Sequence, residues 1–434
     1  MKTISTLTLG CKVNQYETEA MVNMFRDKGY EISKSDFADI YLINTCTVTN
    51  LSDRKSRQYI RRAKKTNPEA IVVVAGCYSQ VSPDEVAQIP EVDIIIGTSD
   101  KNRIVELCDE YIEERERINI VKDIMEVREF EEIDSEGIQE KTRTFMKIQD
   151  GCNQYCTYCI IPYARGRIRS REPENIMEEV HNLVERGYKE IVLTGIHVAS
   201  YGKDLKEDIS LIDIIEKINE VEGIERIRLS SIEPNVITDE FLSRYKNIEK
   251  ACSHFHLSLQ SGSTSVLERM RRRYTAEEYY ESVLKLREEI DDIALTTDVI
   301  VGFPGETDEE FQESCDFVEK VGFSRVHVFQ YSPRKGTPAA EYKEQIDWNI
   351  KHERSKTLIE LADRLTNEFN AQHIGKTMKV LFEEENSKHP EYIEGYTDNY
   401  IRVAVKGDIE ELENEIRDVL IERAADKKLI GRLV

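Results

Sequence analysis

Several features that mark other protein classes are missing from this sequence of 434 residues. No apolar run approaches the roughly 18 residues that suggest a membrane-spanning helix. The start, MKTISTLTLGCKVNQYETE, has no apolar signal core behind a basic tip. There is also no long low-complexity segment and no internal repeat. These absences argue against a membrane, secreted or repeat protein, and we expect a cytoplasmic chain of about three domains, each with its own core.

Positive charge is also scarce. The chain has 60 Lys and Arg against 83 Asp and Glu, which gives a formal net charge of −23. Such a balance argues against a protein that coats nucleic acid over its whole surface, although it permits a local basic groove.

The apolar pattern predicts an α/β protein with three regions. Residues 1–125 alternate buried strands with helices, which predicts a parallel, helix-covered, Rossmann-like sheet. Residues 138–372 contain six strand–helix units, too few for a closed eight-stranded barrel, so we expect an open, TIM-like (β/α)6 partial barrel. Residues 373–434 contain short strands and no convincing helix, which predicts a small antiparallel β-barrel. The expected strands lie at 4–10, 39–45, 70–76 and 92–98 in the first region and at 144–150, 190–195, 226–231, 254–260, 294–302 and 325–332 in the second. The charge-dense segment 110–140 is expected to be a helix end that runs into a linker.

The nine cysteines are the main chemical signal. In a reducing compartment they are metal ligands, catalytic groups or small buried residues rather than disulfide partners. Cys152, Cys156 and Cys159 follow a C-x3-C-x2-C spacing directly after the first expected barrel strand. A structural zinc site needs four ligands, and no fourth lies nearby, although a zinc knuckle could borrow a remote residue. Three thiolates suit a [4Fe–4S] cluster whose fourth iron stays open for a small molecule.

Three further cysteines occupy equivalent positions in the first region. Cys11, Cys46 and Cys77 each follow an expected parallel strand, so all three thiols should emerge at one edge of the sheet, where open α/β sheets bind ligands. One such cysteine would be explained as a buried apolar residue. Three favour a second three-thiolate cluster. We assign Cys108 and Cys315 to the cores under amphipathic helices, and Cys252 to a structural role.

The spacing of Cys152, Cys156 and Cys159, with Tyr158 before the last cysteine, resembles the signature of radical S-adenosylmethionine (SAM) enzymes. In that family the open iron binds the amino and carboxylate groups of SAM. Later strand ends resemble the family's other SAM contacts, namely LTGIH at 193–197, SLQSGS at 258–263 and DVIVGFPGET at 298–307. The resemblance implies SAM contacts from Tyr158, Thr194, Gly195, His197, Gln260, Ser261, Asp298 and Gly302.

Two such cysteine sets, a SAM barrel and a terminal β-barrel together resemble the radical SAM methylthiotransferases, along essentially the whole chain. The resemblance implies two [4Fe–4S] clusters and SAM as cofactors, with the auxiliary cluster on Cys11, Cys46 and Cys77. It also implies a carboxyl-terminal TRAM domain and the replacement of a C–H bond by C–S–CH3. The opening GCKVNQYETEA is similar to the branch that acts on N6-threonylcarbamoyladenosine at position 37 of tRNA. The alternatives are isopentenyladenosine in tRNA, an aspartate of a ribosomal protein, and a non-catalytic iron–sulfur electron carrier.

Three basic stretches are candidates for contact with the anticodon stem-loop of tRNA, at 54–65, 165–171 and 269–274. We expect Arg165, Arg167 and Arg169 to bind phosphates. The alternatives for some arginines of this stretch are binding of the cofactor carboxylate and structural packing. The terminal barrel is acidic, so RNA contact there would need a local face with aromatic residues such as Tyr396 and Tyr400. The alternative is that this domain mainly orients the substrate or packs on the core. We expect a monomer that receives electrons from a flavodoxin- or ferredoxin-type reductant.

Overall fold

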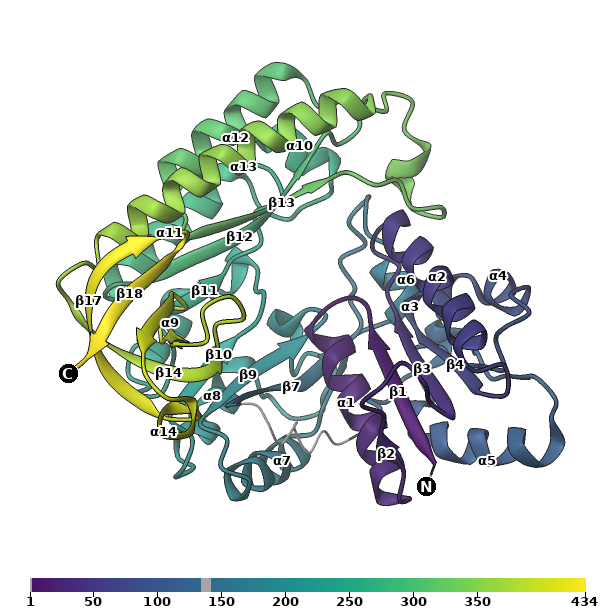
Figure 1. The fold of residues 1–434 in the computed structure, drawn as a ribbon. Coiled ribbons are helices and arrows are strands. Elements are labelled where there is room, and N and C mark those ends of the chain that lie inside the picture. Colours follow the sequence, from purple (N-terminus) through teal and green to yellow (C-terminus); the bar gives the residue numbers. More distant parts are fainter. Residues whose placement is uncertain (1, 134–141) are drawn as a thin grey trace.

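The computed structural model describes residues 2–133 and 142–434 and has three parts, which follow one another along the chain (Figure 1). The expected start of the second region, residue 138, lies outside the described residues, as does the end of the expected linker. None of the described helices is both long and apolar enough to cross a membrane.

The first part is a parallel sheet of six strands in the order β2-β1-β3-β4-β5-β6. Its strands are β1 (Thr3–Thr8), β2 (Glu31–Ile32), β3 (Ile40–Thr45), β4 (Ile71–Gly76), β5 (Ile94–Ile95) and β6 (Ile118–Asn119). Its helices are α1 (Lys12–Asp27), α2 (Asn50–Thr66), α3 (Cys77–Val81), α4 (Pro83–Ala87) and α5 (Ile104–Glu114), with 3-10 turns η1 (Lys101–Arg103) and η2 (Ile124–Glu126). The short strands β2 and β6 had no clear signal in the sequence.

Alternation along the central strands divides this sheet into two cores. Ile40 and Leu42 of β3 pack with α1 and α5, whereas Tyr41 and Ile43 pack with α2 on the other face. Cys108 lies in the first of these cores, as expected. After β1 the chain forms β2 on one side of β1 and then β3 on the other side, so the strand order reverses between β1 and β3. Open α/β sheets bind ligands outside the carboxyl ends of the strands at such a position.

The second part contains six parallel strands arranged as an open barrel in chain order. They are β7 (Arg143–Asp150), β9 (Glu190–Gly195), β10 (Arg226–Leu229), β11 (His254–His256), β12 (Ala294–Val301) and β13 (Arg325–Gln330), and β8 (Arg169–Ser170) adds an antiparallel edge beside β7. Bridges such as Ile227 to Ala251 connect the two hydrogen-bonded sheets at β10 and β11. The expectation of an open (β/α)6 barrel is confirmed.

The barrel has an apolar outside and a polar inside. Strand residues such as Met146, Ile191, Ile227 and Phe255 join the large core beneath the surrounding helices. Their alternating neighbours are polar or charged, and include Lys147, Glu190, Arg226, Arg228, His254, His256, Thr296 and Asp298. Since side chains alternate across a strand, these polar residues face the barrel interior.

Helices cover the outside of the barrel (Figure 1). They are α7 (Pro173–Glu185), α8 (Leu211–Asn219), α9 (Asp239–Tyr245), α10 (Thr264–Arg269), α11 (Ala276–Glu289), α12 (Asp308–Val321) and α13 (Trp348–Ala371), with turns η3 (Val198–Ser200), η4 (Pro234–Val236) and η5 (Pro338–Glu341). The short helix α6 (Ile161–Arg165) instead packs beside α3 of the first part (Figure 1). Capping boxes at Ser210, Thr275 and Thr307 fix where α8, α11 and α12 begin.

The third part is a closed five-stranded barrel in the order β14-β15-β16-β18-β17. Its elements are β14 (Thr377–Glu385), β15 (Tyr392–Thr397), β16 (Arg402–Lys406), α14 (Ile409–Leu412), β17 (Ile416–Ala425) and β18 (Lys428–Leu433). Two details differ from the expectation: β16 and β18 pair in parallel, and the short helix α14 crosses between β16 and β17. The connection from β16 to β18 contains both α14 and the return strand β17, so β16 and β18 run in the same direction.

Candidate functional site

The first set of cysteines lies at the carboxyl edge of the first sheet. Cys11 caps the start of α1, Cys46 follows β3, and Cys77 begins α3 directly after β4. The thiols interact electrostatically with one another, and all three are free. Burial raises the pKa of Cys77 to about 12. The topology therefore brings three thiols from three strands to one place, as the sequence predicts.

The second set lies in the loop between β7 and α6. The backbone N–H of Cys152 donates to the Gly166 carbonyl at 3.0 Å, and that of Cys159 donates to the Cys156 carbonyl at 3.0 Å. Tyr155 has a φ of 50°, a left-handed conformation that turns the loop back on itself. Burial raises the pKa of Cys159 to about 12 and that of Cys152 to about 11. The loop thus directs its three thiols towards a common, water-poor space.

The number and type of donors indicate which metal group each set could hold. Each set offers three free thiols, one fewer than the four ligands of a structural zinc site. Three thiols suit a [4Fe–4S] cluster with one iron left open. His256, Asp298 and His327 form a separate group, whose ligand atoms all lie within 4.8 Å of one another.

A buried ionic cluster connects the two sets. The Arg165 guanidinium, which follows the second set, donates to Cys77 Sγ at 3.4 Å, to Asn14 Oδ1 at 2.7 Å and to Glu17 Oε2 at 3.0 Å. Lys147 and Lys101 also pair with Glu17, at 2.9 and 3.3 Å. Burial alone would raise the pKa of Glu17, but the surrounding cations, Arg165 above all, hold it well below its ordinary value. This cluster fixes the first sheet to the barrel.

A cavity of about 190 Å³ lies where the first part faces the barrel. Its walls come from the second cysteine loop, from β12 and β13, and from the turn after Cys46; the residues include Tyr158, Cys159, Gln260, Asp298, Phe329, Val48 and Thr49. Arg334, two residues after the lining residue Ser332, donates to Thr47 Oγ1 and Asp53 Oδ2 at 2.6 Å each and so holds the barrel to the first part. The backbone N–H of Val48 also donates to Cys46 Sγ, at 3.5 Å. The cavity therefore adjoins both cysteine sets.

The residues expected to bind SAM divide into three groups. Tyr158, Gln260 and Asp298 line the cavity. Thr194, Gly195 and His197 lie at the carboxyl end of β9, where the His197 backbone N–H donates to Gln149 Oε1 at 2.7 Å.

Ser261 and Gly302 do not line the cavity. The Ser261 hydroxyl is buried 3.1 Å from Ser314 Oγ. An ideal Cβ on Gly302 would lie 2.3 Å from Lys351 Cγ. The structure therefore gives both residues close packing against the covering helices.

The structure places two charged residues beside the second cysteine set that sequence reasoning did not assign there, namely Arg272, which was grouped with the stretch 269–274 expected to contact tRNA, and Glu233. Arg272 donates to Cys156 Sγ at 3.4 Å and pairs with Glu233 at 2.7 Å. Glu233 also accepts from Gln154 Nε2 at 3.0 Å and lies 3.1 Å from His197 Nε2. Burial would raise the pKa of Glu233, but the hydrogen bond from His197 and the charge of Arg272 lower it. Glu233 follows the expected strand at 226–231, and that position at a strand end was the available signal.

Burial contradicts the expected RNA role of two of the three arginines. Arg165 is 0% exposed, and Arg169 is 3% exposed and donates to the Arg165 carbonyl. Only Arg167 reaches solvent. The prediction for Arg165 and Arg169 is therefore wrong, because a guanidinium held by buried carboxylates and carbonyls cannot reach a phosphate.

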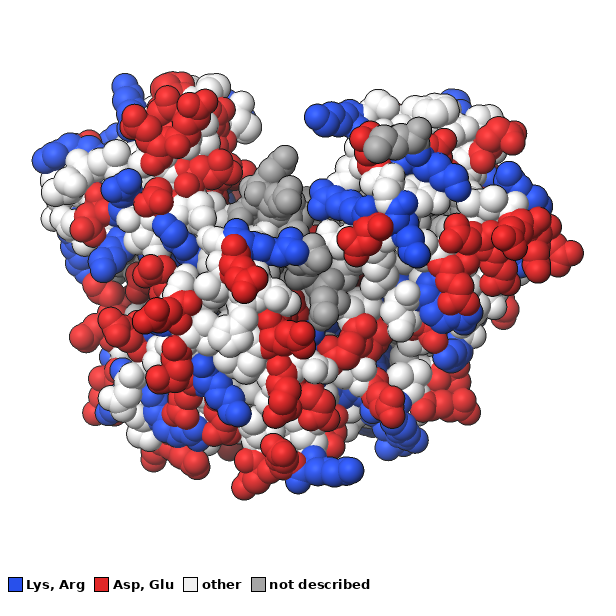
Figure 2. Space-filling model, turned by 90° about the horizontal axis from the view of Figure 1, so that it is seen from below, with Lys and Arg blue, Asp and Glu red and all other residues white. Residues whose placement is uncertain are grey.

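Several exposed cations lie on α2, which begins beside the cavity, and Arg271 and Arg273 of the stretch 269–274 are also exposed. Arg54, Lys55, Arg61 and Lys65 are exposed on this helix. The face of the molecule in Figure 2 has acidic and basic side chains intermixed, with acidic ones predominating, and its coloured residues form no broad basic field. On geometry, α2 is the better candidate for phosphate contact.

Tyr396 and Tyr400 of the terminal barrel face inward. Arg143 lies 4.5 Å from the Tyr396 ring centroid and 5.3 Å from that of Tyr400, and Arg228 lies 4.7 Å from that of Tyr400. These rings pack against the end of the barrel where its strands begin. The expected RNA contact through these two rings is not supported, since cation–π packing on the barrel already uses them.

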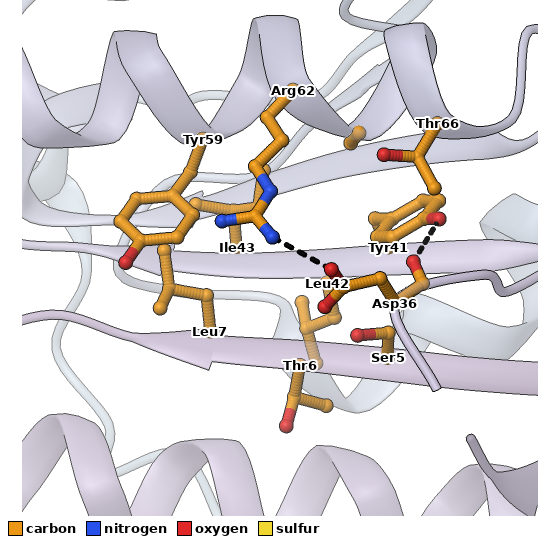
Figure 3. Close-up of a pocket in the computed structure, with 11 residues that line it drawn as sticks. Ser5, Thr6, Leu7, Asp36, Tyr41, Leu42, Ile43, Tyr59, Arg62 and Thr66 are labelled. Atoms are coloured by element: carbon orange, nitrogen blue, oxygen red, sulfur yellow. Dashed lines mark hydrogen bonds and ion pairs between the residues drawn. The ribbon is translucent and has the colours of Figure 1, made fainter. Parts of the chain in front are cut away.

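A second cavity, of about 160 Å³, lies on one face of the first sheet between β1, β3 and α2 (Figure 3). Its charged residues, Arg62 and Asp36, pair with each other at 2.7 Å. Because this pair satisfies the local charge and no cysteine lines the cavity, we assign it no chemistry.

Comparison with known families and structures agrees with the three parts. Residues 3–97 match the model described as Uncharacterized protein family UPF0004, residues 146–318 match the Radical SAM superfamily, and residues 371–434 match the TRAM domain. A solved structure of the radical SAM methyltransferase TsrM from Kitasatospora setae, with cobalamin and a [4Fe–4S] cluster, has a TM-score of 0.58 at 15% identity. That match covers 78% of this chain and 77% of TsrM, and it supports the fold alone.

Curated relatives match nearly the whole chain. The threonylcarbamoyladenosine tRNA methylthiotransferase MtaB of Bacillus subtilis is 48% identical, over 94% of this chain and 91% of the relative. MtaB of Aquifex aeolicus is 43% identical, over 92% and 96%. The tRNA-2-methylthio-N(6)-dimethylallyladenosine synthase of Caldicellulosiruptor saccharolyticus is 41% identical, over 91% and 85%. This chain belongs to the radical SAM methylthiotransferase family.

Proposed function

We propose that this protein adds a methylthio group to C2 of N6-threonylcarbamoyladenosine at position 37 of tRNA. The observation that carries the proposal is the pair of three-cysteine sets beside one cavity: Cys159 lines the cavity, and Cys46 accepts a hydrogen bond from Val48 in its wall. A C–H bond on an adenine ring resists polar attack. The reaction therefore needs one site that generates a radical and another that holds sulfur.

The six cysteines divide those tasks. Cys152, Cys156 and Cys159 would hold the SAM-binding cluster, and Cys11, Cys46 and Cys77 the auxiliary cluster. When bound, the first cluster with SAM supplies a 5′-deoxyadenosyl radical, and the second supplies an open iron for sulfur. Arg165 and Arg272 each donate to a cysteine sulfur, and so place positive charge beside anionic thiolates.

Other residues would hold SAM and exclude water. Tyr158, Gln260 and Asp298 line the cavity, and Thr194, Gly195 and His197 lie at the next strand end. We also propose that Ser261 and Gly302 shape the cofactor site from behind through their packing. Arg334, through its bonds to Thr47 and Asp53, holds the cavity wall against the first part of the chain.

The choice of substrate rests on the relatives. Two MtaB proteins are 48% and 43% identical to this chain, against 41% for a dimethylallyladenosine synthase. We therefore favour threonylcarbamoyladenosine over isopentenyladenosine or a ribosomal aspartate. Cofactor contacts on several strand ends argue against a simple electron carrier.

We further propose a cytoplasmic monomer that meets the anticodon stem-loop and a flavodoxin- or ferredoxin-type reductant. One chain supplies both cysteine sets, so catalysis needs no second copy. We place the domain boundaries at 1–125, 138–372 and 373–434. RNA phosphates would meet the exposed cations of α2 and Arg167.

The test is nucleoside mass spectrometry of tRNA after reaction with the anaerobically reconstituted protein, SAM, sulfide and a reductant. We expect the 2-methylthio derivative of threonylcarbamoyladenosine. The derivative of isopentenyladenosine alone would move the chain to the other tRNA branch. Cleavage of SAM with no modified nucleoside would contradict a tRNA substrate.

A further inference from the structure

Lys12 is a cation at the meeting point of the first sheet and the barrel. It is the first residue of α1, directly after Cys11, and its side chain is half-buried. Its ammonium lies 5.6 Å from the ring centroid of Phe145 on β7. The side chain therefore extends from the auxiliary cysteine set towards the barrel.

The ammonium has no partner among the described residues, since it takes part in no ion pair or hydrogen bond there. Its electrostatic neighbours are Tyr400, Arg143, Arg228 and Glu190, of which only Glu190 is a carboxylate. Arg228 binds the Glu190 carboxylate at 2.6 Å, and Arg143 binds Glu383 at 2.9 Å. Both nearby carboxylates are thus matched by arginines, and Lys12 carries the surplus positive charge.

Polar side chains of the barrel interior surround this charge. His327 on β13 and His254 on β11 both experience the charge of Lys12. His327 and His256 lie close to Asp298, which lines the cavity. Lys12 therefore adds a positive charge to the polar interior to which Asp298 belongs, and this charge would suit a substrate group with one negative charge.

We propose that Lys12 binds the free carboxylate of the threonylcarbamoyl group on the target adenine. This inference rests on the proposed function. The amino group of that threonine is used in the link to N6, so its carboxylate is the only anionic group of the substituent. A charge-assisted bond inside a partly dry interior is stronger than a neutral one. A dimethylallyl group would leave the Lys12 ammonium unpaired, so the same residue would select between the two tRNA substrates.

The experiment compares two anticodon stem-loop RNAs, one with N6-threonylcarbamoyladenosine as the free acid and one with its methyl ester. Reconstituted wild type, Lys12→Met, Lys12→Arg and the control Lys28→Met, an exposed lysine after the same helix, are assayed for kcat and for KM of RNA and of SAM. RNA affinity is measured without reductant by fluorescence anisotropy. Iron content is measured for each variant.

We expect Lys12→Met to raise KM and Kd for the acid RNA about 10- to 150-fold, the range for a lost hydrogen bond to a charged group. Lys12→Arg should recover most of this loss. Wild type should lose a similar factor on the ester, whereas Lys12→Met should treat acid and ester alike. Lys28→Met should behave as wild type.

Three results would overturn the inference. One is an equal loss for Lys12→Met on acid and ester, because the two changes would then act independently. Another is a rise in KM for SAM alone, which would assign Lys12 to the cofactor carboxylate. The third is wild-type behaviour of Lys12→Met on the acid. If wild type modifies neither RNA, the proposed function itself fails, and the inference fails with it.

Discussion

Replacing Arg165 by methionine tests whether this arginine holds the structure together or binds RNA. Methionine keeps much of the length and removes the charge. The change deletes the bonds to Cys77 Sγ, Asn14 and Glu17, at 3.4, 2.7 and 3.0 Å. Removal of one partner from a buried ion pair costs about 3–5 kcal/mol, because the other charge stays buried. Glu17 keeps Lys147 and Lys101, so we expect the lower end, about 3 kcal/mol.

The assay is guanidinium unfolding followed by circular dichroism, with iron content measured in parallel. Arg165→Met should lower the free energy of unfolding and reduce iron bound by the auxiliary set. The matched control is Arg167→Met, because Arg167 is exposed two residues away. It should change stability by less than about 0.5 kcal/mol. It should also reduce, by about one, the slope of the logarithm of the tRNA binding constant against the logarithm of the salt concentration. If Arg165→Met is as stable as wild type and instead loses salt-dependent tRNA affinity, the assignment of Arg165 to the buried cluster is refuted.

Three more predictions concern the clusters and the terminal barrel. Serine at Cys11, Cys46 or Cys77 should leave about four of eight irons per chain and abolish methylthiolation, while SAM cleavage persists. The control Cys315→Ser should keep all the iron. Iron and 5′-deoxyadenosine are measured for each variant, and full activity of a Cys77 variant would contradict the auxiliary site. Burial would raise the pKa of Glu190, but the Arg228 charge and hydrogen bonds lower it to about 2. Its contribution of about 3 kcal/mol is therefore present above the ordinary pKa of 4.5 and lost as pH falls from there towards 2. Glu190→Gln should lose that contribution at pH 7, and its free energy of unfolding should fall less steeply than that of wild type as the pH drops below 4.5. An unchanged pH dependence in this range would rule this out. Tyr400→Leu removes the ring beside Arg143 and Arg228 and should cost about 1–2 kcal/mol. Faster hydrogen exchange at the start of the barrel strands, absent in Tyr392→Leu, would support that role.

The cysteine sets show where sequence reasoning works. Each cysteine directly follows a strand with a strong apolar pattern, and carboxyl ends of parallel strands share one edge. Local pattern and topology rules were therefore enough to predict that Cys11, Cys46 and Cys77 lie at one edge of the sheet.

The arginines show where sequence reasoning fails. Arg165, Arg167 and Arg169 alternate in a short basic stretch, and the sequence gives all three the same appearance. Arg167 is exposed, whereas Arg165 is buried because it pairs with Glu17, which lies 148 positions away in the sequence. Charge that is neutralised by a distant partner leaves no local signal.

The sequence by itself determined the order of the three parts, the open barrel and the six cysteines, since strand alternation, helix periodicity and spacing are local properties of a chain. Only the tertiary structure decided which cations are matched. It paired Arg165 with Glu17, Arg272 with Glu233 and Arg228 with Glu190, and it left Lys12 without a carboxylate. Ion pairing depends on distance in space and on exclusion of water, and the fold sets both.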